Sequence, residues 1–240
     1  MNALIIARRD LAAYLHGFSG WFILSAVLFV TGLLFQVRGL GAGPQKSHEV
    51  LQAFFENCGG LVMISSVLIT MRSFAEERQT GTDVLLQTSP VSATETVLGK
   101  YLAGMGMMTL LLGLTVYMPG LIFVHGKVSV AHIAVGYLGL LCLASATVGI
   151  GVFASTLFRS QMPAGIVAGV VVVTLLLGWR LADVTDAPFA DVFSYAAYWD
   201  KHFTRFMEGR LHVRALVYYL SVTFVFLLGA AKVIEGRRWE

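Results

Sequence analysis

The sequence predicts an all-α, polytopic membrane protein with six membrane-spanning helices, and two observations carry this prediction. Apolar residues make up 57% of the chain and charged residues only 13%, and the mean hydropathy of +0.75 exceeds what a soluble domain buries. Long runs without Asp, Glu, Lys or Arg also recur along the chain, each near the roughly 20 residues that cross a bilayer. The expected spans of this single transmembrane domain, 1–240, are 20–37, 51–70, 101–124, 130–158, 162–179 and 215–233.

The residues before the first span are predicted to form an amphipathic helix. Residues 1–16 place apolar side chains at helical spacing beside a cluster of charges, which favours a helix lying in the membrane interface. A positively flanked start of the first span explains the same pattern equally well. The residues concerned are Leu4, Ile5, Leu11 and Leu15, with Arg8, Arg9 and Asp10. Without a small-residue cleavage pattern here, we expect the first apolar segment to stay in the mature protein.

The second span contains one carboxylate, Glu56. The third span contains Pro119 and Gly120, which predict a kink near its end.

The longest connection, 180–214, is predicted to form short interfacial or re-entrant helices before the last span, because it is too aromatic for a loop in water. Its aromatic residues include Phe189, Phe193, Tyr195, Tyr198, Trp199, Phe203 and Phe206.

Small residues recur four apart within the fourth and fifth spans. Gly165 and Gly169 form one such pair, while Gly149 and Gly151 each have a serine at the same spacing. This spacing lets helices approach closely, either within the chain or at a subunit interface, and both interpretations stay open.

An even number of spans places both termini on one side of the membrane. The basic residues divide almost equally, with nine of 17 on the side of the termini. Arg8 and Arg9 before the first span, with Arg237 and Arg238 after the last, favour cytosolic termini. We therefore expect a multi-pass protein of the cytoplasmic (inner) membrane. The small net charge of +3 is scattered, which argues against a nucleic-acid partner.

A charged island, Met71–Lys100, separates the second and third spans. It holds seven charged residues, Arg72, Glu76, Glu77, Arg78, Asp83, Glu95 and Lys100. Gly81 with Thr82 permits a turn, and Pro90 breaks the chain before the next helix. The charges either solvate a loop or present a docking surface to a partner.

The island also carries residues in a distinctive order. They are Arg72, Ser73, Phe74, Glu76, Glu77, Arg78, Gly81, Thr82, Leu85, Leu86, Ser89, Pro90, Val91, Gly99, Lys100 and Tyr101. This order resembles the first cytosolic loop of ABC-2 type transporter permeases, and the amphipathic N-terminus and the six spans are similar to that family as well. Within it, the chain looks most like gliding-motility-type permeases, on the basis of Tyr218, Tyr219, Leu220 and Ser221 and of Arg237, Arg238 and Trp239.

The resemblance implies a permease subunit of an ATP-driven exporter. Its ATPase-coupling residues would be Arg72, Phe74, Glu76, Glu77, Arg78, Gly81, Thr82, Leu85, Pro90 and Lys100, with Arg159 in a second cytosolic contact. The implied partners are ABC ATPase subunits, a second identical or related permease subunit, membrane lipid and an extracytoplasmic protein. The alternative is a complex that transmits mechanical work to that extracytoplasmic protein without transport. The cargo stays open.

The chain is not expected to be an enzyme. Its two Gly-Lys pairs, at Lys100 and Lys127, lack the upstream glycine and the following Ser or Thr of a phosphate-binding loop. ATP and Mg²⁺ would therefore bind the partner ATPase, and we expect no cofactor or metal on this chain.

Three other kinds of chemistry carry less weight. Ser19 lies in a GxSG pattern seen in intramembrane proteases, but only His16 is near it in the chain, in a poor position for a base. Asp200, His202 and His212 do not match a metal-site spacing. A channel would show ionisable residues facing a pore, whereas these spans offer mainly Thr, Ser and Gly.

Overall fold

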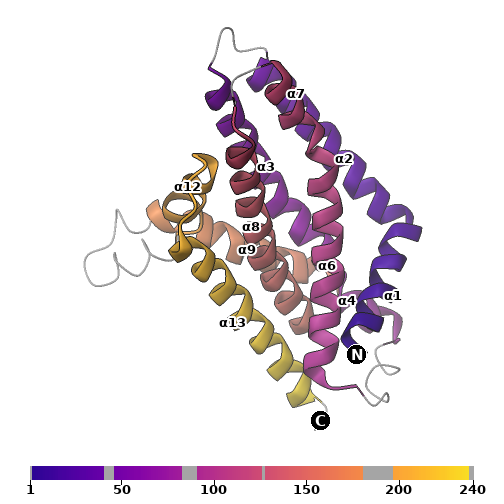
Figure 1. Ribbon diagram of the computed structural model, residues 1–240. Helices are drawn as coiled ribbons and strands as arrows, with labels where there is room; N and C mark the ends of the chain where they lie inside the picture. The colour runs from indigo at the N-terminus through magenta and orange to yellow at the C-terminus, as the bar shows by residue number, and fades with distance from the viewer. Residues whose placement is uncertain (1, 41–45, 83–90, 126–127, 181–196, 238–240) are drawn as a thin grey trace.

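The computed structural model describes residues 2–40, 46–82, 91–125, 128–180 and 197–237, and every regular element in these ranges is helical. The order is α1 (Asn2–His16), α2 (Phe18–Leu34), a π-helical segment η1 (Phe35–Leu40), α3 (Ser47–Thr70), α4 (Ala75–Thr80), α6 (Ala93–Thr115), α7 (Tyr117–His125), α8 (Val130–Leu157), α9 (Gln161–Leu176), a second π-helical segment η2 (Trp199–Phe203), α12 (Thr204–Met207) and α13 (Val213–Arg237). Figure 1 shows the long helices side by side, with both chain ends at the same end of the bundle. The all-helical fold class is confirmed.

Five helical stretches in the described ranges are long and apolar enough to cross a membrane. They are Phe18–Val37, Ser47–Thr80, Ala93–Val124, Val130–Leu157 and Val213–Arg237. The fifth expected span corresponds to α9, whose 16 residues extend about 24 Å, less than the roughly 30 Å of hydrocarbon. The expected count of six spans is therefore not confirmed.

The expected kink in the third span lies slightly earlier than Pro119. Helix α6 ends at Thr115 and α7 begins at Tyr117, with Val116 between them. A proline has no N–H to donate and its ring clashes with the carbonyl four residues before it, here that of Thr115. The break thus lies one turn before the proline that causes it.

Helix α8 is the centre of the bundle, since it packs against α3, α6, α9, α12 and α13. Its small residues allow these contacts. A Cβ added to Gly149 would lie 3.4 Å from Cα of Thr223, and one added to Gly151 only 1.8 Å from Oγ1 of Thr70. Both glycines therefore pack within the chain.

Gly165 and Gly169 on α9 differ in their surroundings. A Cβ on Gly165 would meet Sδ of Met71 at 3.0 Å, whereas one on Gly169 has no neighbour within 4 Å. Gly165 thus packs against the chain, and Gly169 has open space beside it.

Short helices precede the last span, and their aromatic side chains are buried. Tyr198, Phe203 and Phe206 are each fully buried. Phe206 lies against Gly139 of α8, where an added Cβ would come within 2.5 Å of its Cβ. The Tyr219 hydroxyl donates to the carbonyl of Tyr198 at 2.7 Å, which holds this segment to α13. Phe189, Phe193 and Tyr195 lie outside the described residues.

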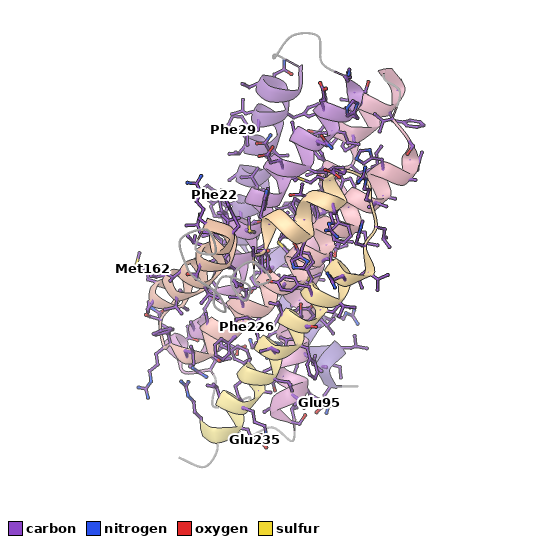
Figure 2. All side chains as sticks on the ribbon, turned by 90° about the vertical axis from the view of Figure 1, so that its left-hand side faces the viewer. Phe22, Phe29, Glu95, Met162, Phe226 and Glu235 are labelled. Atoms are coloured by element: carbon purple, nitrogen blue, oxygen red, sulfur yellow. The ribbon has the colours of Figure 1, made fainter. Side chains whose placement is uncertain are left out.

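The outer faces of the bundle are strongly apolar. Phe29 is 68% exposed on α2 and Met162 is 81% exposed on α9, and Figure 2 shows both at the rim of the bundle. Such faces are unfavourable in water but match hydrocarbon, where the helices satisfy their own backbone groups. They agree with a multi-pass membrane protein.

Candidate functional site

The charged island folds back onto the bundle as a short helix. Helix α3 ends at Thr70, residues 71–74 form a turn, and α4 runs from Ala75 to Thr80. Ser155, near the end of α8, binds the start of α4: its Oγ accepts from the N–H groups of Phe74 at 2.8 Å and Ala75 at 3.0 Å and donates to the carbonyl of Met71. A side chain of α8 thus does the work of an N-cap for α4.

Arg78 adds a second link between α4 and α8. Its Nη1 donates to the carbonyls of Thr156 and Phe158 at the carboxyl end of α8. These carbonyls have no partner within their own helix, and a cation is favourable beside them. The α4 helix is therefore held to α8 at its start and again at Arg78, its fourth residue.

Lys100 is the most deeply buried charge of the island. Only 2% of its side chain is exposed, and its Nζ lies 3.1 Å from Oδ2 of Asp10 and 2.9 Å from Oε2 of Glu77. It also donates to the carbonyl of Ser73 at 2.6 Å and lies 4.9 Å from the ring centroid of Phe74. One ammonium group thus joins α1, α4 and α6, which meet near the N-terminus in Figure 1.

Arg9 completes the cluster and balances its charge. Its Nη2 lies 2.8 Å from Oε1 of Glu77 and 2.8 Å from Oδ1 of Asp10. Partial burial lowers the pKa of Arg9, but the two carboxylates outweigh this effect and the net shift is upward. With two cations and two anions, the cluster is neutral, the condition under which buried charges are tolerated.

Gly99 allows α1 to reach this cluster. A Cβ on Gly99 would lie 2.7 Å from Cβ of Ile6 and 2.9 Å from the carbonyl oxygen of Ala3. Ile6 and Ala7 are the buried residues of α1, while Leu4 and Ile5 are more than 60% exposed. The N-terminal helix therefore packs one face on α6 and leaves another apolar face outside, as an interfacial helix requires.

The far end of α4 is exposed. Gly81 has a φ of 73° and ends the helix in the left-handed conformation, which favours glycine. The backbone N–H of Thr82 then donates to the carbonyl of Glu77 at 2.9 Å. Gln79, Thr80, Gly81 and Thr82 are all exposed, and we call residues 79–82 the α4 tip.

The remaining expected site residues differ in their contacts and exposure, and two of them lie outside the described residues. Arg72 pairs with Glu76 through bonds of 3.0 and 2.8 Å, and the Glu76 side chain stays 42% exposed. Arg159 is exposed just after α8. Leu85 and Pro90 lie outside the described residues.

Sequence reasoning missed several members of this site. The sequence predicts Asp10 and Arg9 only as part of an interfacial helix, and Ser155, the serine four residues after Gly151, only as a helix-packing residue. The one available signal was the carboxylate of Asp10 beside two arginines, which marks a charged point on an otherwise amphipathic helix.

The residues of the other candidate chemistries have structural contacts. The His16 ring bonds to the carbonyl of Ala12 at 2.7 Å, and no bond between His16 and Ser19 occurs in the described part of the chain. The His202 ring stacks on Tyr218 with centroids 4.0 Å apart. His16 is thus not hydrogen-bonded to Ser19 as a catalytic base would be, and the described residues contain no group of three or more His, Cys, Asp or Glu side chains that could hold a metal ion.

One comparison with known proteins gave a match. The family model described as ABC-2 family transporter protein matches residues 5–190. The match runs from the first turns of α1 to beyond the end of α9 and includes all four charged residues of the Lys100 cluster, Arg9, Asp10, Glu77 and Lys100. The search of curated proteins gave no significant match.

Proposed function

The chain belongs to the ABC-2 family of transporter proteins, and we propose that it is the membrane permease subunit of an ATP-driven exporter whose separate ATPase docks on the α4 tip. Family membership implies an ABC ATPase partner and a membrane subunit without catalytic activity of its own. On this proposal the ATPase holds the ATP and Mg²⁺, both termini are cytosolic, and the complex lies in the cytoplasmic (inner) membrane. Two permease subunits, identical or related, form the transport path.

The attachment of α4 carries this proposal. A helix that receives force must be fixed to the parts that move and exposed where the partner pushes. Helix α4 is joined to α8 by Ser155 and Arg78 and to α1 and α6 by Lys100, while its tip is exposed. A push on the tip would therefore be transmitted to helices that run the length of the bundle.

Three groups supply polar contacts for the ATPase. The α4 tip offers hydroxyl and amide groups, Glu76 offers a partly exposed carboxylate, and Arg159 offers a cation. Glu77 and Lys100 already bind each other, so their role is to hold α4 in place. Leu85 and Pro90 are proposed to extend the docking surface.

Transport is favoured over purely mechanical work by an open groove of about 430 Å³ beside α3. This volume lies within the usual range for small-molecule sites, about 300–1,000 Å³. On the mechanical alternative, which the likeness to gliding-motility-type permeases supports, ATP hydrolysis would drive an extracytoplasmic protein and no solute would cross the membrane.

Affinity purification in mild detergent tests the proposal. The wild-type chain should bring down a stoichiometric ATPase with vanadate-sensitive activity, identified by mass spectrometry. Glu76→Lys should lose most of that ATPase. Glu208→Lys is the matched control, because the Glu208 side chain is also 42% exposed and also pairs with an arginine, but lies by α12, away from α4 (Figure 1). A wild-type chain that purifies without an ATPase would refute the proposed function.

A further inference from the structure

A groove opens on the side of the bundle where α3 meets the end of α9 and η2. Its volume is about 430 Å³, and its lining includes Glu56, Gly60, Leu61, Ile64, Trp179 and Trp199. Most of the lining is apolar, and Glu56 is the one ionisable residue among the described lining residues. On α3 (Ser47–Thr70) the groove is lined from Glu56 to Ile64, in the middle of the helix, and its lining includes none of the residues of the Lys100 cluster.

Glu56 lies within the span. It follows Ser47, the first residue of α3, by nine positions, or about 13 Å along a helix that rises about 1.5 Å per residue. It is exposed, and among the described residues it forms no hydrogen bond or ion pair. A carboxylate in hydrocarbon is costly, and such residues are retained where they serve a pathway or bind a partner. A cation seated against Glu56 would offset that cost.

The rest of the groove has the features that an organic cation requires. Trp179 and Trp199 supply indole rings, the best aromatic partners for a cation. The Trp179 ring already accepts a cation, since Cζ of Arg180 lies 4.7 Å from its centroid. Gly60, one turn from Glu56, has nothing within 4 Å of the position of an added Cβ. The glycine thus leaves room beside the carboxylate, while Leu61 and Ile64 offer an apolar wall.

We propose that this groove binds a lipophilic cation, a molecule with an ammonium or phosphonium head and an apolar body, which enters from the bilayer. The head lies against Glu56 and an indole face, and the body lies along the apolar wall. That such cations are also the exported substrates rests on the proposed function. Binding itself does not depend on it.

Equilibrium binding of radiolabelled tetraphenylphosphonium tests the site, with the purified protein and its copurifying ATPase in phosphatidylcholine nanodiscs. Wild type should show saturable binding. Glu56→Gln keeps the shape but removes the charge, and Gly60→Phe fills the open space, so each should weaken binding about tenfold or more. Arg180→Gln should strengthen binding, because it removes a competing cation from Trp179.

Two matched controls separate the groove from general effects. Glu208→Gln removes an exposed carboxylate elsewhere, and Gly113→Phe fills a second glycine position with no neighbour within 4 Å. Both should bind as wild type does. Equal affinity in wild type and Glu56→Gln, or no saturable binding in wild type, would overturn the inference.

The outcomes separate the two proposals. An ATPase that copurifies with a chain unable to bind the cation would leave the proposed function standing and remove the groove. A chain that binds the cation through Glu56 but purifies without an ATPase would do the reverse. Stimulation of vanadate-sensitive ATPase activity by tetraphenylphosphonium, lost in Gly60→Phe, would identify the cation as a substrate.

Discussion

Nζ of Lys100 lies 2.9 Å from Oε2 of Glu77, and this contact joins α4 to α6, the two helices at opposite ends of the charged island. The two residues are separated by 22 intervening positions, eight of which lie outside the described residues. The same ammonium binds Asp10 of α1, so the contact also determines where the N-terminal helix rests.

Lys100→Met should strongly destabilise the protein. The variant leaves the two carboxylates of Asp10 and Glu77 with Arg9 as their one remaining cation in the cluster. Breaking a buried ion pair costs about 3–5 kcal/mol when one partner stays charged. We expect a markedly lower midpoint of thermal unfolding in detergent, followed by tryptophan fluorescence.

The double variant Lys100→Met with Glu77→Gln tests whether the loss of stability comes from the unpaired carboxylate of Glu77. It restores a neutral cluster of Arg9 and Asp10, so its loss of stability should be clearly smaller than the sum of the two single changes. Additive effects would show that Lys100 and Glu77 do not interact as the structure indicates.

Gly99→Ala should displace α1 from α6. The new methyl group would lie 2.7 Å from Cβ of Ile6, and the backbone of Ala3 blocks the other direction. Overpacking of this kind typically costs about 1–3 kcal/mol. Gly113→Ala on the same helix has free space and serves as the control in the same unfolding assay.

A compensating change would identify the contact. Ile6→Ala removes Cγ2 of Ile6, which would lie 2.8 Å from the new methyl group, and leaves a smaller side chain that α1 can shift more easily, so the double variant should recover part of the lost stability. If Gly99→Ala unfolds at the same temperature as Gly113→Ala, the close approach of α1 and α6 is wrong.

Ser155→Ala should loosen the start of α4 while the rest of the bundle stays folded. The backbone N–H groups of Phe74 and Ala75 would lose their acceptor, and each buried donor left unpaired costs about 1–3 kcal/mol. Hydrogen exchange measured by mass spectrometry should show faster exchange in peptides covering residues 74–80. Ser25→Ala, on the exposed part of α2, is the control, and unchanged exchange in residues 74–80 would contradict the capping role of Ser155.

Sequence reasoning succeeded where local composition decides the structure. Hydrocarbon requires long apolar helices, so the run-length of uncharged residues located the helices without knowledge of their neighbours. The aromatic segment before α13 was also predictable, because residues such as Phe203 and Phe206 need a covered surface.

Contacts between distant segments could not be read in this way. Asp10 and Lys100 lie 90 positions apart. No local sequence pattern in either segment indicates that α1 packs against α6 at Gly99. The length of the fifth expected span could not be predicted from composition either. Its residues are apolar enough for a membrane, but the helix ends at Leu176. Glu56 was visible in the sequence, but its groove depends on where α9 ends beside α3.

Charge reversal at two adjacent residues should separate docking from folding. Glu76 is 42% exposed and pairs only with Arg72 in the described part of the chain, so Glu76→Lys should change unfolding by no more than the roughly 0.3–0.5 kcal/mol of an exposed helical pair. Glu77→Lys instead places a third cation beside Arg9 and Lys100, with Asp10 the one remaining carboxylate of the cluster. That variant should unfold at a much lower temperature or fail to accumulate in the membrane. Similar unfolding temperatures for both variants would mean that Glu77, like Glu76, serves the partner surface and that α4 is not held by the cluster.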